Sequence, residues 1–527
     1  MIINSLAPAE RWVNGIGRAL RPAMRKYISL GEVVVKRQMA IGVSLIALML
    51  VSGCAERQTT KATSERLDGL LATGIDEKAL TKAEERLAKT LDKDNATGAL
   101  AATFGEAGSS EGAVSLDQLL ASTVERNSDI GKAAQAINRA DAQRMNAIYG
   151  YLPQVSVSYT YTNVNQEVVE TDNVVFEEGR AEYPVTNLGL DLRQPIFDLS
   201  RIYNIQLQNT ARSVAEVEYI AAVHAAAFET YDAYFAAVQS QARGKSLQAK
   251  MQLVSRQMSV ENTLVSEGLS TDITGRTYAA ELASLAADEA VEASRYADAL
   301  SKLSFVSGLV VTDVSDASLG RLGRTNELSE AAAIEKAKAS NPALLASAIS
   351  VVATELGRKQ ALAADFAPVV EAFARYEDET REGSRFGGGS RTVDTNVGVV
   401  LTIPIFNAAG EGYASTLETV DLRDAALGYY ASKRQIETEI IATIRRLKEL
   451  SSAIGQSSRA LSSISANVED EQARVETGES VDLAVLSRKL AQVSARERLD
   501  FQQIEYLRAW GRLQYLTGED LRELARQ

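Results

Sequence analysis

Residue types that carry chemistry are scarce in this 527-residue chain, which has one cysteine, one histidine and eight prolines. A single cysteine excludes a disulfide framework and a cysteine-based metal site. The only histidine, His224, lies in the alanine-rich stretch AAVHAAAF, which favours a packing role on a helix over membership of a catalytic triad. The one glycine cluster, FGGGSR, lacks the Lys-Ser/Thr ending of a phosphate-binding loop. The sequence therefore predicts no catalytic residues, no metal and no cofactor.

Basic residues are outnumbered by acidic ones. The chain has 56 Lys and Arg against 69 Asp and Glu, a net charge of −13. A protein that binds nucleic acid needs a basic face to neutralise phosphates, so the balance argues against a nucleic-acid partner. Because 46% of the residues are hydrophobic and 24% are charged, the chain can still bury a large core.

Proline is missing from two long tracts, residues 196–341 and 405–527, and both tracts are predicted to be helical. Apolar residues within them recur every three or four positions, a spacing typical of coiled coils. The clearest run is Phe228, Tyr231, Phe235 and Val238. The 73 residues from Pro195 to Gly268 would form a rod of about 100 Å if they were one helix.

The lone cysteine follows an apolar run. Lys36 and Arg37 precede residues 40–51, a charged region followed by a run too short to cross a membrane, as expected of a secretory signal. Val51-Ser52-Gly53-Cys54 resembles the lipobox of bacterial lipoproteins, in which cleavage leaves the cysteine as the acylated first residue. A free thiol in a core helix is the alternative. We predict an N-terminal extension and signal peptide over 1–53 and a polar tether or peripheral helix over 54–112.

The rest of the chain contains one unit twice. ERNSDIGKA at Glu125 resembles KASNPALLA at Lys338, and LRQPIFD at Leu192 resembles LTIPIFN at Leu401. The 40-residue spacing of Gly268 and Gly308 is repeated between Gly478 and Gly518. We predict repeats over 113–320 and 321–527, each in the order helix, strand, turn, strand, long helix, glycine break, long helix.

Each repeat has two candidate strands. In PQVSVSYTYT one face would be apolar and the other would carry hydroxyl groups, because side chains alternate along a strand. The apolar positions are Val155, Val157, Tyr159 and Tyr161, and the hydroxyl positions are Ser156, Ser158, Thr160 and Thr162. Leu188, Leu190 and Leu192 likewise alternate with Asn187, Asp191 and Arg193, and Val397, Val399, Leu401, Ile403 and Ile405 form the apolar face of the last strand. A third strand, around Val369–Glu379, alternates poorly. Residues 167–183 and 381–391 are predicted to be loops.

This arrangement resembles the TolC family of bacterial outer-membrane efflux proteins, over roughly residues 115–525. The resemblance is carried by the repeat architecture, the paired strand exits QPIF and IPIF, and the paired glycines Gly268 and Gly478. It implies a mainly α fold of long coiled-coil hairpins with four strands per chain. In that family three chains together form a 12-stranded transmembrane barrel that continues into a helical tunnel across the periplasm.

The resemblance also implies roles for particular residues. The turns at the glycine breaks would form the periplasmic tip, where an adaptor protein docks. These residues are Gly268, Leu269, Ser270, Gly478, Glu479 and Ser480. The positions of the aspartates that ring the entrance in the family's namesake hold Ala484 and Ser487 here, so Asp272 and Asp482 are the nearest candidates for aperture acids. A solvated helix start is the alternative for both. Val155, Val157, Tyr159 and Tyr161 would face lipid.

The implied partners are two further copies of the chain, outer-membrane lipid, a periplasmic adaptor and an inner-membrane pump of RND or ABC type. The chain would be an exit duct that conducts passively and opens by relaxation of the helix pairs at Gly268 and Gly478. The competing interpretation is a lipid-anchored periplasmic coiled-coil scaffold or an adaptor. Adaptors are expected to flank one hairpin with a compact lipoyl-like domain, whereas this sequence has two equivalent helix pairs.

Overall fold

The computed structural model describes residues 108–109, 112–170, 179–315, 329–383, 388–404 and 413–521. All of them belong to one compact unit, Leu100–Gln527. The predicted signal peptide and the lipidation site Cys54 lie outside the described residues, as does Ile405. They remain predictions.

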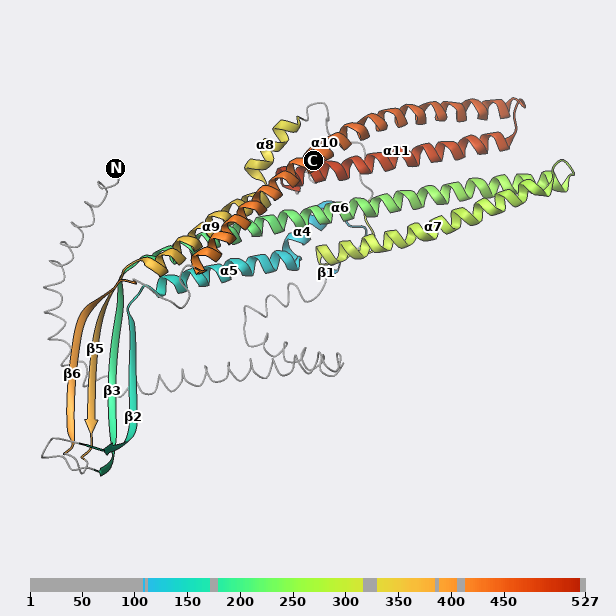
Figure 1. Ribbon diagram of the computed structural model, residues 1–527. Coiled ribbons are helices and arrows are strands. Elements are labelled where there is room, and N and C mark those ends of the chain that lie inside the picture. The colour runs from blue at the N-terminus through green and yellow to red at the C-terminus, as the bar shows by residue number, and fades with distance from the viewer. Residues whose placement is uncertain are drawn as a thin grey trace. The chain divides into compact units, whose positions relative to one another are not determined.

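Two halves follow the predicted order of elements (Figure 1). The first contains α4 (Leu116–Arg126), α5 (Ser128–Tyr149), β2 (Gln154–Val168), β3 (Gly179–Asp198), α6 (Leu199–Ser266) and α7 (Asp272–Ser307). The second contains α8 (Glu330–Ser340), α9 (Pro342–Phe366), β5 (Val369–Arg381), β6 (Ser390–Thr402), α10 (Tyr413–Glu476) and α11 (Asp482–Thr517). A short strand, β1 (Gly108–Ser109), pairs in parallel with β4 (Leu309–Val310).

An asparagine separates the two short helices of each half and ties them to the end of a long helix. The Asn127 side chain accepts hydrogen bonds from the first amides of α5 and donates to the Val306 carbonyl at 2.9 Å. Asn341 caps α9 in the same way and donates to the Leu516 carbonyl at 3.0 Å. Both asparagines are buried, and each therefore satisfies backbone groups that would otherwise lack partners.

Replacing Asn127 with alanine should lower the free energy of unfolding by about 2 kcal/mol, because the helix cap and the buried bond to Val306 are lost together. Asn138→Ala is the matched control, since Asn138 is exposed and bonds only to the exposed side chain of Gln135. Denaturant unfolding of the purified proteins measures the free energy of unfolding of both variants. Equal stability of the two variants would contradict the role given to Asn127.

The helix α6 lies at the centre of the helical packing, with α5, α7, α9 and α11 against it, while α10 packs on α9 and α11. One hydrophobic cluster joins α4, α6, α7 and α11 through buried Leu119, Tyr231, Phe235, Leu303 and Ile504. The coiled-coil seam predicted along α6 is confirmed, because Tyr231, Phe235 and Val238 are all buried. No described helix alone is long and apolar enough to cross a bilayer; α8 and α9 reach that threshold only as a pair bent by 52°.

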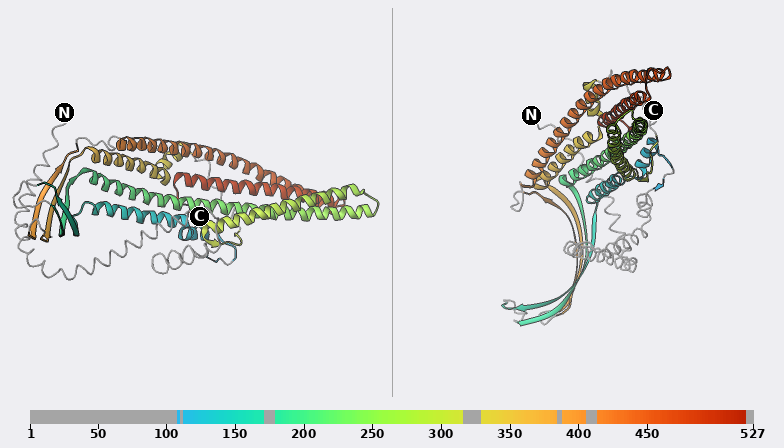
Figure 2. Two further views of the ribbon diagram at one scale, coloured as in Figure 1. Left: turned by 60° about the horizontal axis from the view of Figure 1, so that its bottom comes forward. Right: turned by 90° about the vertical axis from the view of Figure 1, so that its right-hand side faces the viewer.

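The four long strands form one antiparallel sheet in the order β2-β3-β5-β6, and they lie side by side in both views (Figures 1 and 2). No residue separates β3 from α6, and the buried Asp198 caps the helix by accepting a hydrogen bond from the Arg201 amide at 3.0 Å. The predicted loop 167–183 is wrong at both ends. β2 runs to Val168 and β3 begins at Gly179, because cross-strand pairing continues around buried Ala181 and Tyr183.

Candidate functional site: a two-faced sheet and paired helical turns

One face of the sheet is apolar over the end nearer the helices, while toward the β5–β6 turn the same face carries the ion pair of Asp378 with Arg391 at 2.6 Å. Residues that pair across neighbouring strands share a face, and Val157 pairs with Leu190, which pairs with Tyr376. The predicted positions Val155, Val157, Tyr159 and Tyr161 all lie on this face and are 61–69% exposed. Their partners Leu192, Leu190 and Leu188 lie on it too, as do Val397, Val399 and Leu401 of β6. Such a surface is unfavourable in water and favourable against lipid.

The opposite face is polar and charged. Asp191 of β3 pairs directly with Arg375 of β5, and their side chains form an ion pair at 2.7 Å. Arg193 adds a second ion pair to Asp191 at 3.0 Å. Glu377 and Asp394 oppose each other on the neighbouring pair of strands. Because removing this many charged side chains from water is costly, this face of the sheet requires contact with water.

The alternation of β5 was missed by sequence reasoning. Its apolar face is filled by Ala372, Ala374 and Tyr376, while Phe373 and Arg375 point to the charged face. Small residues at every second position gave little hydrophobic contrast, which is why the strand alternates poorly in the sequence. Phe373 fits on the charged face because Gly398 opposes it: a Cβ at Gly398 would come within 2.8 Å of the ring.

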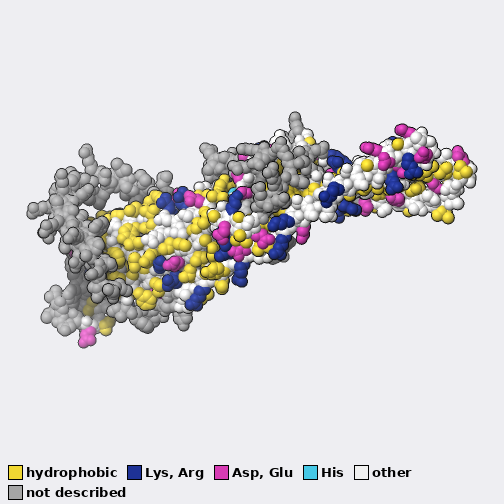
Figure 3. Space-filling view, turned by 90° about the horizontal axis from the view of Figure 1, so that it is seen from above, with side chains coloured by type: hydrophobic (Ala, Val, Ile, Leu, Met, Phe, Trp, Pro, Cys, Tyr) yellow, Lys and Arg dark blue, Asp and Glu magenta, His cyan; other side chains and the backbone are white. Residues whose placement is uncertain are grey.

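The surface of the helices is apolar toward one end and charged along the rest. Figure 3 shows hydrophobic side chains gathered toward the end of the helices that meets the sheet, and charged side chains along the rest. Four apolar residues in the first half of α10 are each more than half exposed, namely Leu417, Val420, Leu427 and Tyr430. Their spacing of three and seven residues is that of a coiled-coil seam, and none of the described residues covers it.

The two turns between long helices have the same backbone structure. Gly268 and Gly478 adopt φ values of +74° and +78°, a left-handed conformation that glycine allows. The amides of Leu269 and Glu479 then donate to the carbonyls of Leu264 and Arg474, both at 2.8 Å. Leu269 is 72% exposed at the end of its hairpin. The paired glycine breaks predicted from the sequence are thus two copies of one turn.

Asp272 and Asp482 are the first residues of α7 and α11. Asp272 is 73% exposed and pairs with Arg276 one turn later at 3.4 Å, as expected of a solvated helix start. Asp482 lines a groove of about 480 Å³ between the two hairpins together with Arg256 and Lys489. Ser487, at one position where the family's namesake has an aspartate, accepts a hydrogen bond from the buried Gln257 at 3.0 Å.

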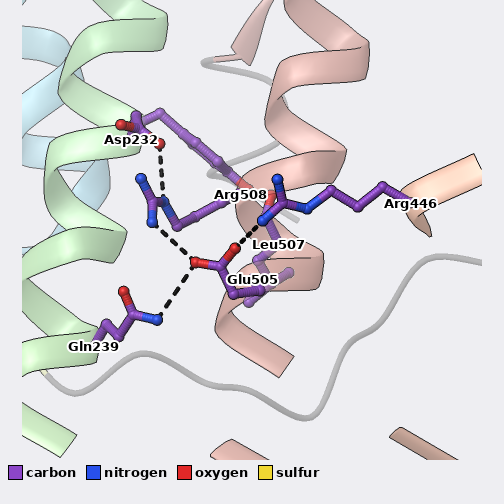
Figure 4. A network of polar contacts seen from close by, with 7 residues as sticks. Asp232, Gln239, Arg446, Glu505, Leu507 and Arg508 are labelled. Carbon is purple, nitrogen blue, oxygen red and sulfur yellow. Dashed lines mark hydrogen bonds and ion pairs between the residues drawn. The ribbon is translucent and has the colours of Figure 1, made fainter. Parts of the chain in front are cut away.

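A charged network joins the two repeats farther from the turns (Figure 4). Arg508 of α11 donates to Asp232 of α6 and to Glu505, both at 2.9 Å, and Glu505 also pairs with Arg446 of α10. Burial opposes the charge of Arg508, but its bonds to Asp232 and Glu505 outweigh this and raise its pKa above the ordinary value. At the interface of α6 with α11 this network thus adds polar contacts to the hydrophobic cluster that contains Tyr231, Phe235 and Ile504. Sequence reasoning missed the network, because Arg508 and Asp232 are 276 residues apart in the chain.

Among the described residues, no group of three or more His, Cys, Asp or Glu side chains is placed to hold a metal ion. Burial raises the pKa of Tyr296, with a hydrogen bond to Asp313, to about 12, and burial alone raises that of Tyr506 to about 12. Both hydroxyl groups therefore stay neutral near pH 7 and serve as packing and hydrogen-bonding groups.

No protein-family model matches the chain, and no curated protein matches it by sequence. Solved structures do match. The outer-membrane channel OprN aligns with a TM-score of 0.66 at 17% identity, over 77% of this chain and 90% of its own. The CmeC outer membrane channel of Campylobacter jejuni gives 0.63 at 17% identity, over 76% and 85%. The open state of the MtrE outer membrane channel of Neisseria gonorrhoeae gives 0.61 at 15% identity, over 77% and 89%.

At identities of 15–17%, the TM-scores of 0.61–0.66 establish the fold alone. The alignments span three quarters of the chain, and the described residues form the same combination of four strands with two pairs of long helices that the sequence predicts. The chain therefore has the fold of the TolC-like outer-membrane efflux channels, which confirms the resemblance found in its sequence.

Proposed function

We propose that the chain is one protomer of a trimeric outer-membrane channel, the exit duct of a tripartite efflux pump or a type I secretion system. The observation that carries the proposal is the sheet with one apolar and one charged face. A sheet of this kind separates lipid from water, and no catalytic chemistry is needed for conduction.

The sheet is incomplete by itself. Its outer strands β2 and β6 each have one unpaired edge, and open edges are not tolerated in lipid. Spanning barrels have at least about eight strands, so several copies of a four-stranded sheet are required. Three copies would give the twelve strands that the resemblance implies. The unpartnered apolar stripe on α10 fits the same assembly, because a neighbouring copy would cover it.

The remaining parts of the proposal follow from this placement. Cys54 would anchor the chain in the outer membrane through lipid, and the helices would extend into the periplasm. The turns at Gly268 and Gly478 would meet a periplasmic adaptor that connects to an inner-membrane pump. Energy would come from that pump, and the channel would conduct passively. OprN, CmeC and MtrE are outer-membrane channels with this fold, which supports the assignment.

The assembly is tested by isolating the full-length protein from outer membranes. A trimer that dissociates on heating and forms water-filled pores in planar bilayers is the expected result. A protein that leaves the membrane as a soluble monomer once its lipid is removed would instead identify the periplasmic scaffold, and the channel would be abandoned.

Opening would separate the hairpin α10–α11 from α6 near the turns, where Gln257 of α6 bonds to Ser487 of α11. Linking Gln257→Cys to Ser487→Cys with a short, reducible bifunctional thiol crosslinker should abolish most export until a reductant is added, because the native side chains touch, with Gln257 Nε2 3.0 Å from Ser487 Oγ. The control pair is Gln492→Cys and Ser465→Cys, which lies within the second hairpin at 2.9 Å and should leave export unchanged. Accumulation of a fluorescent pump substrate in intact cells measures both. Full export with the first pair crosslinked would exclude this movement.

A further inference from the structure

The two turns share more than their glycines. The sequence E-x6-G-x-S-x-D occurs once in each repeat, from Glu261 to Asp272 and from Glu471 to Asp482. Glycine and aspartate have evident local reasons, a left-handed φ and a helix start. The glutamate and the serine have none at the level of secondary structure, since the glutamate lies within the last two turns of a long helix.

In three dimensions the glutamate and the serine meet. The Ser270 hydroxyl donates to the Glu261 carboxylate, and the Ser480 hydroxyl donates to the Glu471 carboxylate. Glu261 is only 4% exposed and Glu471 only 8%. Burial of a carboxylate lowers stability unless hydrogen bonds compensate for the lost water. The same burial and the same bond in both repeats therefore indicate that the pair has a role. We call each of these bonds a clasp.

Each clasp spans a turn at its exposed point. The residue between the glycine and the clasped serine is Leu269 in the first turn and Glu479 in the second. Leu269 is 72% exposed, and the nearby Ile273 is 66% exposed. The clasp holds the backbone on both sides of this residue, so the same frame presents an apolar side chain at one turn and an acidic one at the other.

We propose that Glu261 and Glu471 are positioning residues that fix the two turns for docking of a protein partner, through Ser270 and Ser480. The consequence for docking rests on the proposed function. A partner matched to this surface places an apolar side chain against the first turn and a basic side chain against the second. The structural part of the proposal concerns the turns themselves and is measurable without any partner.

Amide hydrogen exchange of the full-length protein in lipid nanodiscs tests the clasps. Glu261→Leu should speed exchange of the Leu269 amide about tenfold, which corresponds to about 1.4 kcal/mol of lost local stability, and leave the second turn unchanged. Ser270→Ala should have the same effect, and the double variant should be no faster than either single one. Glu261→Gln should keep the slow exchange of the Leu269 amide, because the side-chain oxygen of the glutamine still accepts a hydrogen bond from Ser270. A general loss of packing would not be rescued in this way.

The control is Glu267→Leu, an exposed glutamate in the same turn, which should not change the exchange of Leu269. Glu471→Leu should act on the second turn alone. Unchanged exchange in Glu261→Leu, or an equal rise in both turns, would overturn the proposal. Since exchange does not depend on conduction, a channel that proves inactive with intact clasps would refute the proposed function and the docking role, and leave the structural role of the clasps standing.

Discussion

Replacing Tyr159 with arginine is expected to prevent assembly in the outer membrane, whereas the same replacement at Thr160 is expected to be tolerated. The two residues are neighbours on β2 and point to opposite faces of the sheet, Tyr159 to the apolar one. An arginine on the lipid side of a barrel costs about 2–4 kcal/mol near the middle of the bilayer and little on the lumen side. In a trimer that cost would be incurred three times.

The amount of heat-dissociable trimer in outer-membrane fractions measures this effect. Total protein in whole-cell extracts serves as the control for expression. If Thr160→Arg failed to form the trimer and Tyr159→Arg formed it, the charged face would be the one that meets lipid. The assignment of the two faces would then have to be exchanged.

Replacing Gly518 with alanine should lower the free energy of unfolding by about 2–5 kcal/mol. Its φ of +74° costs a non-glycine residue about 1–2 kcal/mol. In addition, a Cβ at this position would overlap the Ser340 carbonyl and stand 3.0 Å from the Asn341 amide nitrogen. The neighbouring backbone would have to shift, and overpacking of that kind costs a further 1–3 kcal/mol, approximately.

Gly478→Ala separates the two contributions. Its φ of +78° is nearly the same, but nothing lies within 4 Å of the added Cβ. Only the conformational cost of about 1–2 kcal/mol should therefore remain. Denaturant unfolding of both variants gives the difference. Equal destabilisation would show that α8, α9 and the end of α11 are not packed as closely as described.

Much of the fold could be predicted from the sequence because its signals are local and occur twice. The absence of proline predicted α6 and α7 and their counterparts, the glycine pairs predicted the ends of the hairpins, and the alternation of β2 predicted which side chains share a face. Each of these depends on backbone conformation or on period, and both can be read from neighbouring residues.

The features that were missed depend on contacts between distant residues or on weak contrast. The bond from Arg508 to Asp232 and the charged face around Arg375 have no local pattern. Glu261 and Glu471 could have been found, since the motif that contains them is repeated, but a glutamate inside a helix is usually interpreted as a solvated residue. Only burial distinguishes these two from the exposed glutamates around them.

The direct passage from β3 into α6 couples the first hairpin mechanically to the sheet. In the first repeat the strand ends at Asp198 and the helix begins at the next residue, so rotation of α6 would twist the sheet itself. Any torque applied to the far end of α6 would therefore be passed directly into the strands.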